Sequence, residues 1–204
     1  MLLLAPLIPR GLSVAMGISI AENKLIGAHQ VDSPNQSERP AESVVDLLIL
    51  HNISLPPGEY NTGCIDQLFC NCLDKNAHPY FETIADLKVS SHFLINRLGS
   101  ITQYVPLNMK AWHAGESTFD GRLNCNDFSI GVELEGTDHE PFTDAQYGSL
   151  VTLSIALLSE FPDIGLDRIV GHSDVAPERK TDPGPFFQWD RYKQLLEQEL
   201  ASTA

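Results

Sequence analysis

The sequence is poor in basic residues and has no long apolar run. Lys and Arg number 13 against 27 Asp and Glu, so the formal net charge is −14. A chain of this sign repels nucleic acid and anionic membrane surfaces, and we exclude both as partners. No apolar run approaches the ~20 residues of a membrane-spanning helix. Hydrophobic residues still make up 43% of the 204 residues, which is enough for one folded domain with an ordinary core.

Cysteine is also scarce, and its spacing is irregular. The four cysteines, Cys64, Cys70, Cys72 and Cys125, form no C-x-x-C pair and no disulfide framework, which fits a reducing compartment. A structural zinc on Cys70 and Cys72 is one interpretation. The apolar, periodic segment around them favours the other, in which they are small core residues.

The N-terminus lacks the features of an export signal. Its apolar run is short, is interrupted by Pro6 and Pro9, and has no basic residue ahead of it, so we expect no secretion. Met16 is an alternative start, which would make residues 1–15 an artefact of gene-start assignment. We assign residues 1–24 to an N-terminal extension and residues 25–200 to the single domain. Residues 29–43 are polar and proline-bearing and predict an exposed arm.

Strand and helix patterns alternate along the rest of the chain. Residues 44–52 are nearly all apolar, as in a central strand covered on both faces, and residues 91–106 predict a hairpin. Apolar spacing predicts a short helix over 65–73, and a capping box at Thr143 opens a longer helix that ends before Pro162. A C-terminal amphipathic segment follows at 189–200. This order predicts an α/β domain with a central mixed sheet flanked by helices.

The segment at 171–185 carries the most chemistry. It holds His172, Lys180 and Asp182 among three prolines and two glycines, which predicts a rigid loop rather than a helix. Ile169 and Val170 predict the end of a buried strand just before it. A strand that delivers a histidine into a stiff loop, followed by an aspartate, can supply two ligands to one metal. Catalytic zinc takes three protein ligands, so the third must come from elsewhere.

His51 and Glu133 are the candidates that complete this set. His51 ends the strand at 44–52; a lone buried histidine is more often a hydrogen-bonded core residue, but here two further ligands need a partner. In the strand at 128–136, period two places Glu133 on one face with Gly131 and Glu135. That face could belong to a solvated edge strand. The apolar flanks and the bracketing glycines Gly131 and Gly136 favour a functional carboxylate instead.

These residues predict hydrolysis of an amide. His51, His172 and Asp182 form a two-histidine, one-carboxylate set suited to Zn²⁺ with an open position. Zinc lowers the pKa of bound water towards ~7. Glu133 is the candidate general base that orients the water and later protonates the leaving amine, and Lys180 the fixed positive charge beside the oxyanion. The set alone does not identify the amide.

The A-W-H-A-G segment at 111–115 has two interpretations. Trp112 and His113 form either the wall of a pocket or a packed corner. His113 is also an alternative metal ligand in place of Asp182. His92, in the first arm of the predicted hairpin, is expected to be structural.

Six segments, in order, closely resemble the AmpD family of bacterial amidases: H-N-I-S-L-P-P-G-E, N-A-H-P-Y-F, A-W-H-A-G, C-N-D-F-S-I-G-V-E-L-E-G-T-D, T-D-A-Q-Y and A-P-E-R-K-T-D-P-G-P. The resemblance spans about residues 25–195. It implies the type 2 amidase fold, shared with peptidoglycan recognition proteins. It also implies a cytoplasmic N-acetylmuramoyl-L-alanine amidase with one zinc, which acts on small 1,6-anhydro-muropeptides in cell-wall recycling. We expect a monomer.

The resemblance also implies residue roles. The family's zinc ligands fall on His51, His172 and Asp182, its catalytic acid on Glu133 and its lysine on Lys180. Tyr80 matches a tyrosine near the metal, and Asn52, Trp112 and Ala176 match positions that line the substrate groove. The chain departs at Lys88 and Asn124, where family members often carry arginines thought to meet substrate carboxylates. Lys88 keeps the charge without the bidentate fork, and Asn124 loses the charge.

Two other functions compete with a cytoplasmic recycling amidase. The first is an exported amidase that acts on intact peptidoglycan, which would require the apolar N-terminus to act as a signal. The second is a binding module that senses muropeptides without cleaving them. Recognition proteins of that kind lack a full metal set, whereas every position is filled here.

Overall fold

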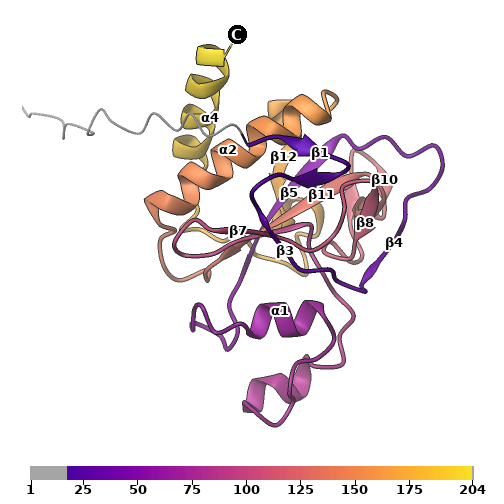
Figure 1. Ribbon diagram of the computed structural model, residues 1–204, viewed down its shortest axis with the longest axis vertical. Coiled ribbons are helices and arrows are strands. Elements are labelled where there is room, and N and C mark those ends of the chain that lie inside the picture. The colour runs from indigo at the N-terminus through magenta and orange to yellow at the C-terminus, as the bar shows by residue number, and fades with distance from the viewer. Residues whose placement is uncertain (1–17, 204) are drawn as a thin grey trace, which may run out of the picture.

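A six-stranded sheet runs through the centre of the protein, whose residues 18–203 are described by a computed structural model (Figure 1). Its first four strands are parallel, β6 and β7 form an antiparallel hairpin, and β3 is parallel to β7. The predicted mixed sheet and the hairpin are confirmed. The strand order is β12 (Ile169–Gly171), β5 (Leu47–Ile53), β11 (Ser129–Glu135), β6 (Phe93–Ile95), β7 (Ile101–Gln103) and β3 (His29–Gln30).

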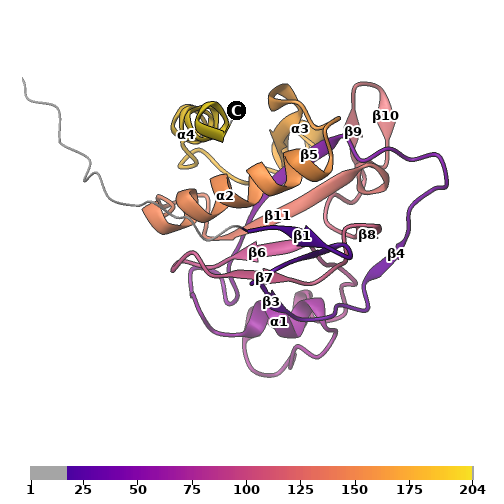
Figure 2. The same ribbon diagram turned by 45° about the horizontal axis from the view of Figure 1, so that its top comes forward.

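Helices cover both faces of the sheet, so the predicted α/β architecture is also confirmed. Helices α2 (Asp144–Glu160) and α4 (Trp189–Thr203) lie together on one face, and α1 (Cys64–Phe69) lies on the other (Figure 2). No helix within 18–203 combines the length and the apolar character that crossing a membrane requires. The short elements are β1 (Ile20–Ala21), β2 (Lys24–Leu25), β4 (Gln36–Glu38), β8 (Met109–Ala111), β9 (Thr118–Phe119), β10 (Arg122–Leu123), α3 (His172–Val175), and the 3-10 turns η1 (Pro79–Thr83), η2 (Cys125–Asp127) and η3 (Leu166–Arg168).

Strand β5 divides its side chains between two apolar cores. Leu48 and Leu50 belong to the main core with residues of α2 and α4, whereas Leu47 and Ile49 belong to a smaller cluster on the other face. Because side chains alternate along a strand, His51 continues the Leu47 and Ile49 face, away from α2. The strand register therefore decides which side of the sheet carries the candidate ligand.

Strand β11 lies at the centre of the sheet, between β5 and β6. All seven of its residues are buried, which excludes the solvated edge-strand interpretation of its acidic face. Glu133 pairs in register with His51, so the two residues are neighbours on adjacent parallel strands.

The capping box predicted for α2 is confirmed. The hydroxyl of Thr143 accepts the backbone N–H of Gln146 at 3.1 Å, and the Gln146 side chain accepts the N–H of Thr143 at 3.0 Å. Gln146 also donates to the carbonyls of Ile95 and Glu135, which end β6 and β11. One residue thus closes the helix start and ties it to the sheet.

The predicted helix over 65–73 is too long. Helix α1 ends at Phe69, because Asn71 adopts a left-handed conformation with φ 59° and stops the helix. Leu73 is still buried, but Cys72 is exposed and does not share the apolar face. The chain beyond Leu73 then forms the 3-10 turn η1 at Pro79–Thr83.

The predicted exposed arm at 29–43 is partly built into the fold. Strand β3 extends the sheet, and Ser33 and Asn35 are buried. Both side chains donate to the carbonyl of Phe69, at 2.6 and 3.2 Å. These two side chains supply hydrogen-bond donors to the carbonyl at the C-terminal end of α1. The polar composition of the segment alone did not predict this role. The expectations for Pro6, Pro9 and Met16 lie outside the described residues.

Candidate active site

The candidate metal ligands and catalytic residues line one cleft of about 520 Å³ at the carboxyl ends of the parallel strands. His51 comes from the end of β5, Glu133 from the end of β11, and His172 directly follows β12. Loops beyond the carboxyl ends of parallel strands are where α/β sheets form their sites. Lys180 and Asp182 reach the cleft from the segment after α3.

Three of these side chains bring one donor atom each to a common point. Nδ1 of His51, Nδ1 of His172 and Oδ2 of Asp182 are each 3.0 Å from the other two. Donor atoms around a tetrahedral zinc, at ~2.0–2.1 Å from the ion, lie ~3.3 Å apart. The three residues therefore have the size and donor chemistry of one face of a zinc site.

The protonation of these groups also fits a cation. Nε2 of His172 lies 3.0 Å from the carbonyl oxygen of Ala114, which can only accept a hydrogen bond. Nε2 therefore carries a proton, and in the metal-binding form of the ring Nδ1 is an acceptor that faces the acceptor Oδ2 of Asp182. Two acceptors at this distance repel unless a positive charge lies between them, so the set is suited to a metal ion.

Burial and the carboxylate act in opposite directions on His51. Burial lowers its pKa to about 4, although the hydrogen bond with Asp182 opposes that shift. Burial also raises the pKa of Asp182, but the close contacts with the rings of His172 and His51 outweigh burial and leave that pKa well below its usual range. A neutral imidazole and an ionised carboxylate are the forms that bind metal.

Glu133 is a buried acid with an unsatisfied oxygen. Its residue exposure is 8%, and Oε2 has no hydrogen-bond partner among residues 18–203. Burial raises its pKa well above the usual carboxyl range; Asp182 adds to the shift and Lys180 opposes it. A carboxyl group with such a pKa can exchange a proton near neutral pH.

The segment at 171–185, which carries His172 and Lys180, was predicted as a rigid loop. That prediction is wrong for the first turn of the segment, because His172–Val175 form the short helix α3. The carboxylate of Asp174 accepts the N–H of Gly171 at 2.7 Å and caps this turn before the first proline, Pro177, is reached. His172 is therefore held at the start of a helix rather than in a loop.

The other candidate residues divide into two groups. Asn52, Tyr80 and Trp112 line the cleft with the metal set. Lys88, Asn124 and Ala176 are not among its lining residues. Lys88 and Asn124 are exposed, whereas Ala176 is buried and its carbonyl accepts the backbone N–H groups of Arg179 and Lys180. Lys88 lies between two lining residues, Leu87 and Val89.

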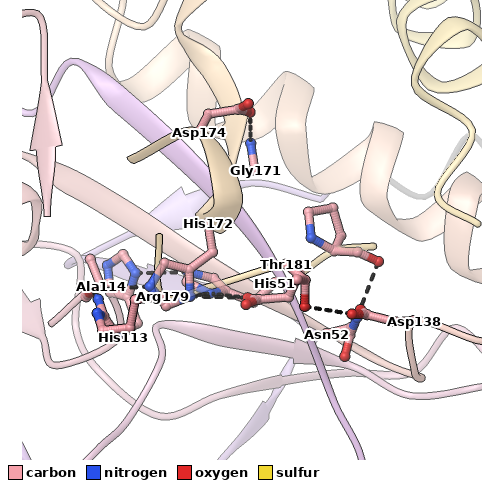
Figure 3. Close-up of polar contacts among 12 residues, drawn as sticks. His51, Asn52, His113, Ala114, Asp138, Gly171, His172, Asp174, Arg179 and Thr181 are labelled. Carbon is pink, nitrogen blue, oxygen red and sulfur yellow. Dashed lines mark hydrogen bonds and ion pairs between the residues drawn. The ribbon is translucent and has the colours of Figure 1, made fainter. Parts of the chain in front are cut away.

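Asp138 is a cleft residue that the sequence analysis missed. It accepts a hydrogen bond from the Asn52 amide at 2.7 Å and another from the Thr181 hydroxyl at 2.5 Å (Figure 3). Asn52 follows His51 and Thr181 precedes Asp182, so one carboxylate braces the neighbours of two candidate ligands. The only sequence signal was a polar residue shortly after the end of β11.

His113 is buried behind His51 rather than at the metal set. Its Nδ1 contacts Nε2 of His51 at 2.9 Å, whereas Nδ1 of His51 faces Asp182. Among the described residues, the cluster able to hold a metal contains His51, His172 and Asp182 and does not include His113. Burial above all lowers the pKa of His113 well below its ordinary value, so its ring is neutral.

A mixed sheet that presents two histidines, an aspartate and a buried glutamate to an open cleft is typical of metal-dependent hydrolases. The sequence profile of the N-acetylmuramoyl-L-alanine amidase family matches residues 37–185. The chain belongs to this family, and it is an amidase.

Individual sequence relatives and one solved structure refine this assignment. The 1,6-anhydro-N-acetylmuramyl-L-alanine amidase AmpD of Escherichia coli K12 is 53% identical over 175 residues, which cover 86% of this chain and 95% of the relative. The AmpD of Haemophilus influenzae is 50% identical over 173 residues, covering 85% and 94%. A crystal structure of an AmpD derivative superposes with a TM-score of 0.85 at 52% identity, covering 87% of this chain and 98% of that one. The predicted AmpD resemblance and fold are confirmed.

Proposed function

We propose that this amidase is zinc-dependent and hydrolyses the bond between the lactyl group of 1,6-anhydro-N-acetylmuramic acid and L-alanine in small muropeptides. The convergence of His51, His172 and Asp182 beside the buried Glu133 carries the proposal. The names of the AmpD relatives support the substrate. So does the structure of Escherichia coli AmiD with anhydro-N-acetylmuramic acid-L-Ala-D-gamma-Glu-L-Lys, which is 28% identical with a TM-score of 0.56.

The protein residues have distinct roles in this proposal. His51, His172 and Asp182 would hold the zinc, which would supply Lewis acidity towards water and the scissile carbonyl. Glu133 removes a proton from the attacking water and then delivers it to the nitrogen of the departing L-alanine. Lys180 places its positive charge beside the oxygen that gains negative charge as the carbonyl is attacked.

The cleft also provides surfaces that can hold the substrate. Tyr80 and Trp112 offer aromatic area, and Leu68, Phe69 and Ile84 form an apolar wall. We assign Asn52 a bracing role, because its amide is already bonded to Asp138 and to the carbonyl of Pro183. Lys88 and Asn124 stay proposals for contacts with substrate carboxylates.

Product analysis by mass spectrometry tests the reaction. We expect free tripeptide from anhydro-muramyl tripeptide but not from intact sacculi, and loss of release when zinc is chelated. Glu133→Gln should lower kcat by ~10²–10⁴-fold, the usual contribution of a general acid–base group. The exposed His29 serves as a control, and His29→Ala should keep full activity.

Other product patterns would point to different functions. Peptides released from sacculi would favour the exported amidase that acts on intact peptidoglycan. Zinc binding without release from either substrate would favour the sensing module. We place the protein in the cytoplasm as a monomer; fractionation of cells and light scattering of the purified protein test those two assignments.

A further inference from the structure

The side chain of His113 is buried against the back of a proposed zinc ligand, and the proposed reaction gives it no role. Nδ1 of His113 lies 2.9 Å from Nε2 of His51, and the two rings meet edge to face with centroids 5.0 Å apart. The other ring nitrogen of His51, Nδ1, is the one that faces His172 and Asp182. His113 therefore touches a ligand without reaching the metal set.

The hydrogen bonds behind His113 have only one consistent direction. The carbonyl of Cys125 can only accept, so the Ser129 hydroxyl donates to it at 2.6 Å. The Ser129 oxygen then accepts from Nε2 of His113 at 3.3 Å. Because the neutral His113 ring carries its proton on Nε2, Nδ1 is an acceptor and Nε2 of His51 must donate to it. Nδ1 of His51 is thereby left unprotonated, facing Asp182.

The same short segment also supports the second histidine. The carbonyl of Ala114 accepts Nε2–H of His172 at 3.0 Å, and it accepts Nη2 of Arg179 at 2.6 Å (Figure 3). The side-chain oxygen of Asn126 accepts the backbone N–H groups of His113 and Ala114, at 3.1 and 2.8 Å. Asn126 therefore holds in place the backbone that carries the His113 ring and the carbonyl of Ala114.

Strand β11 leaves room for this ring. A Cβ atom added to Gly131 would lie 2.5 Å from Cγ of His113, which is far inside van der Waals contact. Any other residue at this position would displace the ring from His51 or the strand from its partners. Gly131 therefore allows the backbone of β11 to lie against the His113 ring.

We propose that His113 is a positioning residue for zinc, which holds His51 in one tautomer and one orientation through the chain from His51 to the carbonyl of Cys125. The inference rests on the proposed zinc site. Partners of this kind typically contribute 10–100-fold in metal affinity. A ligand side chain that is already held in its binding orientation also loses less conformational freedom when zinc binds.

Zinc affinity, measured by competition with a chelator of known affinity, tests the proposal on the full chain. His113→Leu keeps the bulk and removes the acceptor, and we expect zinc to bind ~10–100-fold more weakly. His113→Asn keeps an oxygen near the place of Nδ1 and should stay within a few-fold of the wild-type affinity. Ser129→Ala removes the group that orients His113 and should fall between the two. His29→Ala is the control and should bind zinc as the wild type does.

Each alternative has its own outcome. Equal zinc affinity of the wild type and His113→Leu would overturn the proposal. Equal losses of zinc affinity in His113→Leu and His113→Asn would also overturn it, because altered packing alone would explain equal losses. X-ray absorption of the zinc-bound variants should show two histidine ligands, as in the wild type. If the His113→Leu variant shows one histidine ligand fewer than the wild type, His113 is a direct ligand and the proposal is wrong. If His113→Leu does not fold, the zinc affinities of Ser129→Ala and His113→Asn still test the proposal. A wild type that binds no zinc would overturn the proposed function instead.

Discussion

Glu133 and Glu135 lie on the same face of one strand, yet their surroundings differ completely. Both oxygens of Glu135 accept backbone N–H groups, from Asn61 at 2.6 Å and from Arg97 at 3.1 Å. It therefore ties two loops to the end of β11. Glu133 has no such partner for Oε2, and its pKa is raised. A period-two pattern treats the two acids alike, and only their neighbours separate an anchor from a candidate base.

Lys180 should influence the pH dependence of the reaction through Glu133. The base must be ionised, so activity falls as the pH drops through the pKa of Glu133, which burial holds above the usual carboxyl range. The charge of Lys180 lowers that pKa. Lys180→Gln should therefore raise it and move the acidic limb of kcat/KM to higher pH, along with a ~10²–10³-fold loss of kcat.

The measurement is a pH profile of kcat/KM on anhydro-muramyl tripeptide at raised enzyme concentration. Lys75→Gln removes an exposed lysine that does not line the cleft and should leave the limb in place. An unchanged or lower limb in Lys180→Gln would contradict the proposed coupling of the two groups.

At the scale of elements, helix α2 is joined to the sheet at its first turn. Thr143 caps the helix and also donates its hydroxyl to the carbonyl of Arg97 at 2.9 Å. Gln146, three residues on, bonds the ends of β6 and β11. The capping box therefore orients the helix on the sheet as well as starting it, and the loop that carries Asp138 is held between β11 and this turn.

Removing this cap should destabilise the protein. Thr143→Ala loses both hydroxyl bonds, and we expect the free energy of unfolding in urea to fall by ~1–2 kcal/mol. Thr152 lies later in the same helix, where its hydroxyl bonds only the carbonyl of Gly148. Thr152→Ala should change the free energy of unfolding by less than ~0.5 kcal/mol. Equal effects of the two substitutions would mean that the cap contributes nothing beyond a surface threonine.

At the scale of the whole molecule, the apolar clusters and the candidate metal ligands occupy different parts of the fold. Three apolar clusters surround the sheet, and the candidate ligands lie at its rim rather than within the main core. We therefore expect a chain that folds without zinc and gains stability when zinc binds.

Thermal unfolding with and without zinc checks this expectation. Free zinc at ~100 times its Kd should stabilise the fold by ~2.7 kcal/mol, which corresponds to a rise in Tm of ~5–10 °C for a domain of this size. His51→Ala should unfold with no dependence on zinc. A wild-type Tm that zinc does not change would argue against a zinc site in the native state, and loss of all structure on chelation would show that folding requires the metal.

The sequence by itself determined the elements whose signals are local. The apolar run of β5, the capping box of α2 and the hairpin of β6 and β7 follow from side-chain periodicity and turn residues over a few positions. The candidate ligands could also be predicted, since metal chemistry restricts them to few residue types. The motifs of the AmpD resemblance then pointed to their family.

Tertiary structure decided everything that depends on contacts between distant segments. Asp138 contacts Asn52, His113 contacts His51 and Ser129 contacts His113, which are 86, 62 and 16 positions apart, and no local pattern marks such partners. The same holds for the buried Ser33 and Asn35, whose polar composition predicted an exposed arm. Their burial depends on the open end of α1, which only the folded chain brings to them. Hydrogen-bond direction and burial are properties of neighbours in space, and the order of residues does not contain them directly.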